Sequence, residues 1–333
     1  MSEAIGTGAR ADPAAKPTVL RFFSIDVLRR TFPFIFLVVL VAIFTGLNTR
    51  FLSFDNLMTV LEQCTVLLVA ALAMTFIIMA GSIDISVGSI VGLSALVAAL
   101  TAPTLGAWAI VPSVAVGLAC GLANGLLLAV GKVPSFIATM GTGVVYRGMV
   151  LFFTRGSPVE IEDKGFLSLY ADYSWGVLSH QVIIGIALAI VCWAIASYTV
   201  FGREVRAIGG GERVSILTGI SVVRVKIYMF LLLGVLCGIA GVLQGARTMA
   251  ASAQLGQGLE LDAIAAVVVG GTPLTGGIGS VVNTMLGVVI ITLLSNGMNM
   301  AGVDPYLQAI VKGIVLICAV FITIDRKKIG IIK

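Results

Sequence analysis

Apolar residues fill most of the chain in stretches of about twenty, and short groups of glycine, proline or charged residues separate them. A membrane-crossing helix needs about 20 apolar residues, so this pattern predicts transmembrane helices. The predicted helices lie at 32–48, 57–80, 86–103, 109–130, 135–153, 181–200, 227–249, 261–272, 277–297 and 306–324. The eighth of these is too short for a full crossing. We therefore expect an all-α polytopic membrane protein with about ten transmembrane helices.

Two runs of glycine and hydroxyl residues interrupt this pattern, at 80–89 and 270–280. Lipid cannot satisfy a broken backbone, so irregular segments at membrane depth must lie inside protein or beside water. Both runs end alike, with Val87-Gly88-Ser89-Ile90-Val91 and Ile278-Gly279-Ser280-Val281-Val282. Paired interruptions are typical of transporters, so we predict two broken-helix segments related by a weak internal repeat. Chance similarity between two glycine-rich loops is the alternative. The expected break glycines are Gly81, Gly88, Gly271 and Gly277.

The composition agrees with a membrane location and excludes most enzyme classes. Hydrophobic residues make up 59% of the chain and charged residues only 11%, whereas soluble domains have about 25% charged residues. No G-x-x-x-x-G-K-[ST] loop occurs, so the chain is not itself an ATPase of that kind. It has a single histidine, and its five cysteines are scattered without metal-ligand spacing. We expect no enzymatic activity, no metal site, no cofactor and no nucleic-acid partner.

Basic residues predict the orientation, because cytoplasmic loops of membrane proteins are enriched in Lys and Arg. The N-terminal segment 1–30, the loop 201–226 and the C-terminal end are basic, whereas the loop 154–180 is acidic. Ten crossings with both ends inside satisfy every charged loop. We therefore expect a cytoplasmic tail at 1–30 and a transmembrane domain at 31–328, with a periplasmic loop at 154–180. The loop 201–226 and the end 329–333 would be cytoplasmic.

Ionisable candidates at membrane depth are Glu62, Asp84, Arg147 and Lys312. Charges at this depth normally face protein or water, so each is a functional candidate. Arg147 and Lys312 have stems long enough to reach the interface instead. The short carboxylate of Asp84 lies in the first break. It could cap the following helix or face a transport path, and the sequence leaves both open.

The loop 201–226 contains a short segment, starting at Glu212, with a polar beginning and an apolar stripe. Such a helix could rest on lipid headgroups, or it could dock into a groove of a partner protein. A transporter without its own ATPase would need such a contact.

The run 80–92 resembles the G-x-I-D-[LI]-S-V-G signature of the permease subunits of ribose-type bacterial ABC sugar importers. The resemblance spans about 33–328 and continues through Ala207-Ile208-Gly209-Gly210, Leu217-Thr218-Gly219-Ile220, Glu260-Leu261-Asp262-Ala263, Gly270-Gly271-Thr272, Gly276-Gly277-Ile278-Gly279-Ser280, Asn296-Gly297-Met298-Asn299 and Lys312-Gly313. It implies a permease that moves a monosaccharide inward across the inner membrane. The chain departs from the family pattern at Gly211, where Asn is usual, and at Val214-Ser215, where two alanines are common.

The resemblance also implies the partners of the chain: a second permease subunit, with a homodimer expected, a cytoplasmic ATPase subunit and a periplasmic sugar-binding protein. Membrane lipid is expected around the permease itself. Residues expected to contact the ATPase are Gly209, Gly210, Glu212, Arg213 and Gly219. Polar candidates for the substrate path are Asp84, Ser86, Asn124, Asn296 and Asn299, although asparagines in membrane helices also join helices to one another. The alternatives are an importer for a polyol, a signalling sugar or a branched amino acid, and an ion-coupled secondary carrier.

Overall fold

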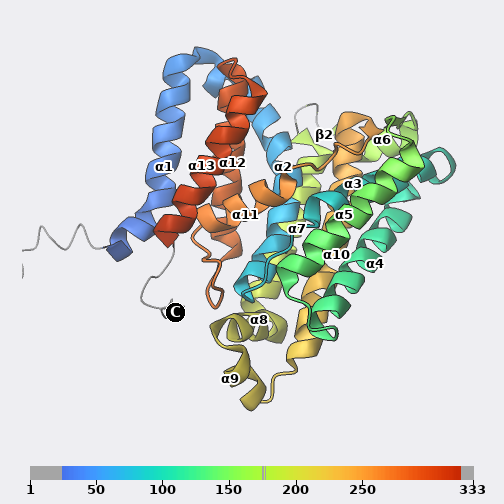
Figure 1. Cartoon of the computed structure of the whole chain (residues 1–333). Coiled ribbons are helices and arrows are strands. Elements are labelled where there is room, and N and C mark those ends of the chain that lie inside the picture. Colours follow the sequence, from blue (N-terminus) through green and yellow to red (C-terminus); the bar gives the residue numbers. More distant parts are fainter. Residues whose placement is uncertain (1–24, 175, 177, 324–333) are drawn as a thin grey trace, which may run out of the picture.

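The computed structural model describes residues 25–174, 176 and 178–323, and in these ranges the chain is almost entirely helical (Figure 1). The predicted tail 1–30 therefore lies largely outside the described residues, and the C-terminal end 329–333 lies wholly outside them. The elements are α1 (Ile25–Leu47), η2 (Thr49–Leu52), α2 (Phe54–Met79), α3 (Val87–Leu105), η3 (Gly106–Ala109), α4 (Ile110–Ala129), α5 (Ser135–Thr154), β1 (Val159–Glu160), α6 (Lys164–Tyr170), β2 (Tyr173–Ser174), β3 (Leu178–Ser179), α7 (His180–Tyr198), α8 (Val200–Gly210), α9 (Glu212–Leu217), α10 (Val222–Thr248), β4 (Ala250–Ala251), α11 (Leu259–Val269), α12 (Val281–Met300) and α13 (Pro305–Thr323).

Each of the ten predicted apolar stretches lies on a helix, which confirms the all-α fold. Six helical stretches are long and apolar enough to cross a membrane, and one of these, Val87–Ala129, contains both α3 and α4. Two further apolar helices are shorter, within Thr31–Leu47 and Pro305–Phe321. The 11 residues of α11 extend about 16 Å, roughly half of the hydrocarbon core. The count of ten crossings stays a prediction.

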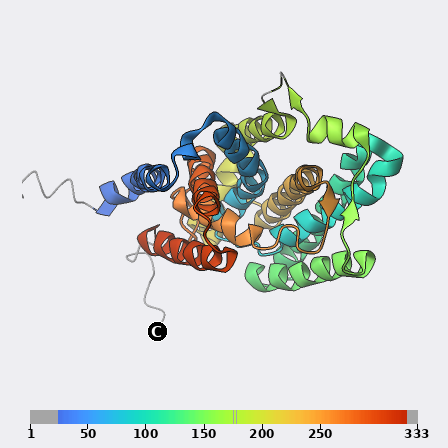
Figure 2. The ribbon, with the colours of Figure 1, turned by 90° about the horizontal axis from the view of Figure 1, so that it is seen from above.

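The centre of the bundle is formed by α2 and α10 (Figure 2). Every residue of α2 from Cys64 to Met79 is buried, as expected for a helix that is apolar on all sides. α10 packs against α2, α3 and α4. Other helices therefore surround these two, and the polar groups near them are shielded from lipid.

Glycines bring α4 and α10 unusually close together. A Cβ on Gly117 would overlap the carbonyl oxygen of Gly234, and a Cβ on Gly234 would overlap that of Gly117. The next pair repeats the contact, because a Cβ on Gly121 would lie 3.0 Å from the Cα of Gly234. Small residues spaced by four are a common way to pack membrane helices, because they add van der Waals contact between backbones.

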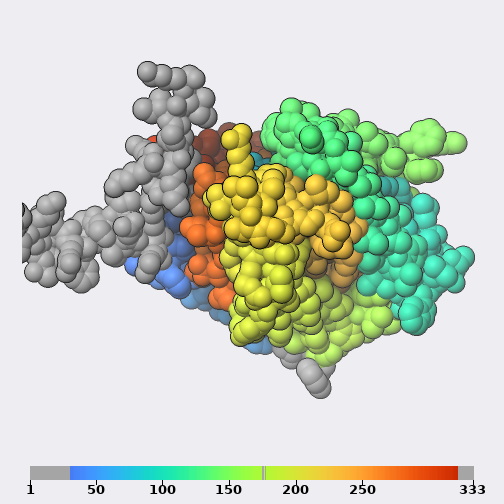
Figure 3. Space-filling model, turned by 90° about the horizontal axis from the view of Figure 1, so that it is seen from below, coloured from blue at the N-terminus to red at the C-terminus, as the bar shows by residue number. Residues whose placement is uncertain are grey.

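The two predicted loops lie at opposite ends of the bundle (Figure 1). At one end, α6 packs on η3, where the Tyr170 hydroxyl donates to the carbonyl of Ala107 at 2.8 Å. At this end β1 also pairs with β4 in an antiparallel ladder. At the other end lie α8 and α9, which form the yellow surface in Figure 3. The arrangement agrees with placing 154–180 and 201–226 on opposite sides of a membrane.

Candidate functional site

The first break begins where α2 ends at Met79. Gly81 has a φ of +74°, a left-handed conformation that glycine adopts without strain. Its N–H donates to the carbonyl of Ile78 at 2.9 Å, and the N–H of Ser82 donates to that of Ile77 at 3.0 Å. These two bonds form a Schellman turn, which satisfies the last carbonyls of the helix.

Side chains of α5 satisfy the irregular backbone beyond this turn. The N–H of Ile83 donates to Ser135 Oγ at 3.2 Å, and the N–H of Ile85 donates to Thr139 Oγ1 at 3.0 Å. Neither partner was recognised from the sequence. Backbone N–H groups that are turned away from water need an acceptor within the protein, and these two hydroxyls supply it.

A buried polar cluster then joins the break to α4 and α5. One carboxylate oxygen of Asp84 accepts from the N–H and the hydroxyl of Ser86, both at 2.6 Å. Asn124 donates to Ser86 Oγ at 2.8 Å and lies 3.4 Å from the second Asp84 oxygen. The Tyr146 hydroxyl lies 3.4 Å from Asn124 Oδ1 and donates to the Cys120 carbonyl at 3.1 Å. The structure thus brings together three of the five candidate path residues.

Asp84 lies two residues ahead of the N-cap position of α3. That position is Ser86, whose own side chain makes no capping bond, and Asp84 accepts from the N–H of Ser86 in an Asx turn that leads into the helix. The capping role of Asp84 stays a prediction. Asp84, Ser86 and Asn124 have no exposed surface. Their contact with a solute in transit stays a prediction, and it requires this cluster to open.

The second break starts with the same turn. Gly271 has a φ of +91°, and its N–H donates to the carbonyl of Val268 at 2.8 Å. The N–H of Thr272 donates to that of Val267 at 3.1 Å. The same pair of bonds also ends α12 around Gly302, so the shared turn is no evidence for duplication. The internal repeat stays a prediction.

Backbone groups hold most of the second break in place. Gly276 and Gly277 both have positive φ, at +76° and +83°. The N–H of Gly277 donates to the carbonyl of Met79 at 2.9 Å, so the second break is bonded to the end of α2. Ser280 caps α12, since its side chain accepts from the N–H of Asn283 at 3.4 Å.

The two breaks meet at the end of α8. A Cβ on Gly209 would overlap the carbonyl oxygen of Met79 and the backbone nitrogen of Gly277. A Cβ on Gly276 would lie 2.6 Å from the backbone nitrogen of Gly81. Gly209, expected at the ATPase contact, therefore packs inside the chain against both breaks. Figure 3 shows the orange segment around 270–280 beside the yellow α8–α9 region. We call the backbone contact of Met79, Gly209 and Gly277 the glycine junction.

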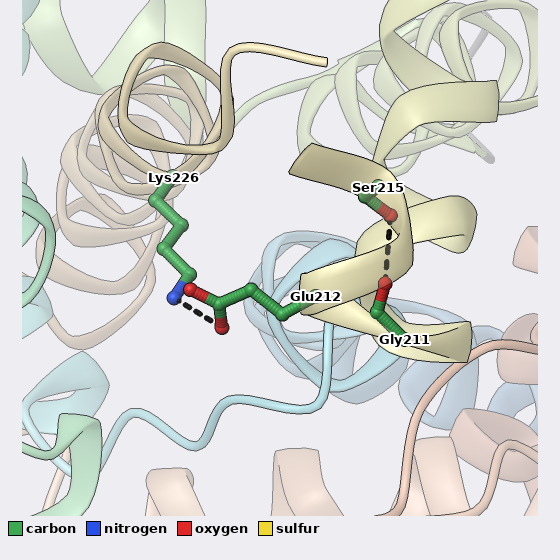
Figure 4. Close-up of polar contacts among 4 residues, drawn as sticks. All are labelled: Gly211, Glu212, Ser215 and Lys226. Carbon is green, nitrogen blue, oxygen red and sulfur yellow. Dashed lines mark hydrogen bonds and ion pairs between the residues drawn. The ribbon is translucent and has the colours of Figure 1, made fainter. Parts of the chain in front are cut away.

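The short helix predicted to start at Glu212 is confirmed as α9. Glu212 forms an ion pair with Lys226 of α10 at 2.8 Å, and Ser215 Oγ donates to the Gly211 carbonyl at 3.0 Å (Figure 4). Gly210 is exposed at the end of α8. The ion pair joins α9 to α10, so Glu212 has a partner within the chain.

Apolar side chains of α9 are exposed. Val214, Ile216 and Leu217 are 65%, 56% and 87% exposed. Arg213 is also exposed, and Gly219 ends the helix with a φ of +87°. An amphipathic helix of this kind, at one end of the bundle, is suited to contact with another protein.

Asn296 and Asn299 lie away from the Asp84 cluster, near the opposite end of α12. Asn296 is buried and exchanges two hydrogen bonds of 3.0 Å with Asn56 of α2. Asn299 is exposed and accepts from Gln308 of α13 at 2.8 Å. In this conformation both amides join neighbouring helices.

The fourth break glycine, Gly88, and a further cavity complete the site. Gly88 lies in the first turn of α3, beyond the break itself. Beside it is a cavity of about 240 Å³ whose lining includes Ser89, Arg147, Gln257 and Glu260. Of these lining residues, only Arg147 was a candidate from the sequence. Glu260 met the same criterion, because it is an ionisable residue at the start of the short eighth apolar stretch.

The chain matches the family described as branched-chain amino acid transport system permease component over residues 56–320. It is 40% identical to the ribose import permease protein RbsC of Bacillus subtilis, over 91% of this chain and 94% of the relative. It is 33% identical to the xylose transport system permease protein XylH of Haemophilus influenzae, over 84% and 91%. It is 32% identical to the galactose/methyl galactoside import permease protein MglC of the same organism, over 90% and 95%. No solved structure matches the chain.

Proposed function

The chain belongs to this permease family of ABC importers, and we propose that it carries a monosaccharide inward across the bacterial inner membrane. Three relatives that it matches over most of their length are named for ribose, xylose and galactose. The family description names branched-chain amino acids. The identity of 32–40% to sugar permeases favours a monosaccharide over an amino acid.

The observation that carries the coupling part of the proposal is the exposed apolar face of α9. Val214 and Leu217 lie at one end of the bundle, outside the apolar core. The chain contains no G-x-x-x-x-G-K-[ST] phosphate-binding loop, so transport driven by ATP would take its energy from a partner. We propose that α9 docks into a groove of a cytoplasmic ATPase subunit, held in position by the Glu212–Lys226 ion pair.

The remaining partners follow from the same arrangement. The end that carries α6 would face the periplasm and a sugar-binding protein, and α8 and α9 would face the cytoplasm with both chain termini. A second copy of the permease would complete the transport path. The domain limits 1–30, 31–328 and 329–333, and the assignment of 154–180 and 201–226 to opposite sides, are part of this proposal.

The proposal is tested by transport and by co-purification. We expect cells with the permease, its ATPase and its binding protein to take up labelled ribose, xylose or galactose. Leu217→Asp should abolish co-purification of the ATPase and lower uptake at least tenfold, because it places a charge in the docking contact. The permease should reach the membrane at its normal level, since Leu217 is 87% exposed.

Leu169→Asp is the matched control, because Leu169 is an exposed leucine of α6 at the opposite end. It should leave ATPase co-purification unchanged. Normal co-purification of Leu217→Asp would contradict the docking site. Uptake of leucine in place of the three sugars would contradict the substrate class. Uptake that persists with a hydrolysis-deficient ATPase would favour a secondary carrier.

A further inference from the structure

A small polar cavity lies beside the first break, outside the Asp84 cluster. Its volume is about 240 Å³, and its polar lining residues are Ser89 of α3, Arg147 of α5, Gln257 and Glu260 of α11. Arg147 lies near the middle of α5, and Ser89 lies in the first turn of α3. The cavity opens at the surface of the described bundle, since Met140, Val144 and Gln257 in its lining are exposed, and it places charged groups on a helix face that is otherwise largely apolar.

The charged groups of this cavity are incompletely paired. Arg147 donates from one guanidinium nitrogen to the carbonyl of Ala253 at 2.7 Å, and arginine has five N–H donors. Glu260 Oε2 is buried and accepts no hydrogen bond in the part of the chain that the structure describes. A buried acceptor without a partner is costly, so this oxygen requires a donor from water or from a solute.

The absence of a side chain at Gly88 places Glu260 in the cavity wall. A Cβ on Gly88 would overlap both Glu260 Oε2 and the carbonyl oxygen of Gly256. One turn further along α3, a Cβ on Gly92 would lie 2.9 Å from the carbonyl oxygen of Leu255. The start of α3 therefore packs directly against the backbone of the segment before α11. This packing places the carboxylate of Glu260 next to the first break.

Polar residues continue from this cavity across one face of the bundle. A second cavity of about 280 Å³ shares Gln257 and contains the Lys312–Asp262 ion pair, at 2.8 Å. Figure 2 shows α5 in green and α13 in red on the same side of the molecule. Intramembrane charges normally face water or protein, so this face is not a lipid-facing one.

We infer that Ser89, Arg147, Gln257 and Glu260 form a binding site for the hydroxyl groups of a small polyhydroxylated solute in transit. The inference rests on the proposed function and gives it a location. Sugar hydroxyls both donate and accept hydrogen bonds. The guanidinium supplies donors, the carboxylate supplies acceptors, and the serine hydroxyl and glutamine amide supply both. The Asp84 cluster is closed to a solute in this conformation, whereas Gln257 is exposed.

The test uses the complete transporter in membrane vesicles, with saturating binding protein and labelled ribose, xylose and galactose. Arg147→Gln and Glu260→Gln should each lower the maximal uptake rate at least tenfold. The amount of assembled complex should remain unchanged. Arg155→Gln, at the end of the same helix, and Glu162→Gln, in the loop that follows, are the matched controls and should transport normally.

Gln257→Ala keeps the test decisive if the charge variants do not assemble. Gln257 is exposed, and its side chain makes no described hydrogen bond, so folding does not depend on it. We expect at least a threefold change in the ratio of ribose to xylose uptake. Unchanged rates and ratios in the assembled variants overturn the site. A native complex that transports none of the three sugars refutes the proposed function instead, so the two failures are distinct.

Discussion

The two helix breaks start with the same turn but are stabilised by different groups. In the first, Ser86 and, from α4, Asn124 donate to the fully buried carboxylate of Asp84, and hydroxyls of α5 accept from the backbone of the loop. In the second, three glycines with positive φ form the loop, and a backbone bond from Gly277 to Met79 anchors it. The first break should therefore be sensitive to loss of polar side chains, and the second to addition of side-chain atoms.

The difference follows from where each break lies in the bundle. The first is enclosed by α4 and α5, so any backbone group that is released must be satisfied by a neighbouring hydroxyl or amide. The second lies against the end of α8, next to the surface formed by the α8–α9 region (Figure 3). The side-chain hydrogen bonds around Asp84 thus lie next to the close-packed backbone of the second break. The glycine junction connects both breaks to α8, which α9 follows directly.

Adding one carbon atom to the glycine junction should have the largest effect. In Gly209→Ala, the new Cβ would overlap the backbone of Met79 and Gly277, which cannot move aside as a flexible side chain could. Overpacking of this kind costs about 1–3 kcal/mol or more. We expect a marked fall in the amount of folded permease, and at least tenfold lower uptake from whatever reaches the membrane.

Gly210→Ala is the matched control, because a Cβ on Gly210 meets no atom within 4 Å. Its amount of folded permease in the membrane should be native. If Gly209→Ala reaches the same amount, the contact between α8 and the two breaks is loose, and the junction cannot transmit movement from α9.

Much of the fold was predictable, because its information is local. The apolar stretches set the helices, and the glycine and hydroxyl runs set both breaks. The early start of α10 at Val222 was not predicted, since Arg224 and Lys226 interrupt the apolar pattern there. The lysine is used in the Glu212 ion pair, a contact that hydropathy does not report.

The candidate site was predictable only in part, because its contacts join distant segments. Asp84, Ser86 and Asn124 were recognised as polar residues at membrane depth, but nothing local indicated that Asn124 reaches Ser86. Gly209 was expected at a partner contact because of the resemblance, and its close packing against Met79, far earlier in the chain, was not predicted. Such pairings depend on helix packing, which one sequence does not display.

The second-largest effect is expected at Asp84, where size and charge can be separated. Asp84→Leu leaves the N–H of Ser86 and the amide of Asn124 without their acceptor, and each such buried loss costs about 1–3 kcal/mol. The amount of folded protein should fall. Asp84→Asn retains one oxygen for Ser86, so it should fold nearly as well, although its amide would meet that of Asn124. An Asn variant that reaches the membrane fully but has lost uptake would falsify the capping interpretation.

The smallest effect is expected for serine-to-alanine substitutions at matching positions of the two breaks. The positions match because Ser86 directly precedes α3 and Ser280 directly precedes α12. Ser86→Ala removes a hydroxyl that donates to Asp84 and accepts from Asn124, both fully buried, and should cost about 1–3 kcal/mol. Ser280→Ala removes only a 3.4 Å cap at a partly exposed position, which should cost about 0.5 kcal/mol. Thermal unfolding of the purified permease in one detergent gives both midpoints. A larger drop for Ser86→Ala is expected because its partners lose their bonds in a dry interior, whereas the N–H of Asn283 is exposed enough to bind water. Equal decreases in the unfolding midpoint would mean that side-chain hydrogen bonds contribute equally at both breaks. The first break would then not differ from the second in how it is stabilised.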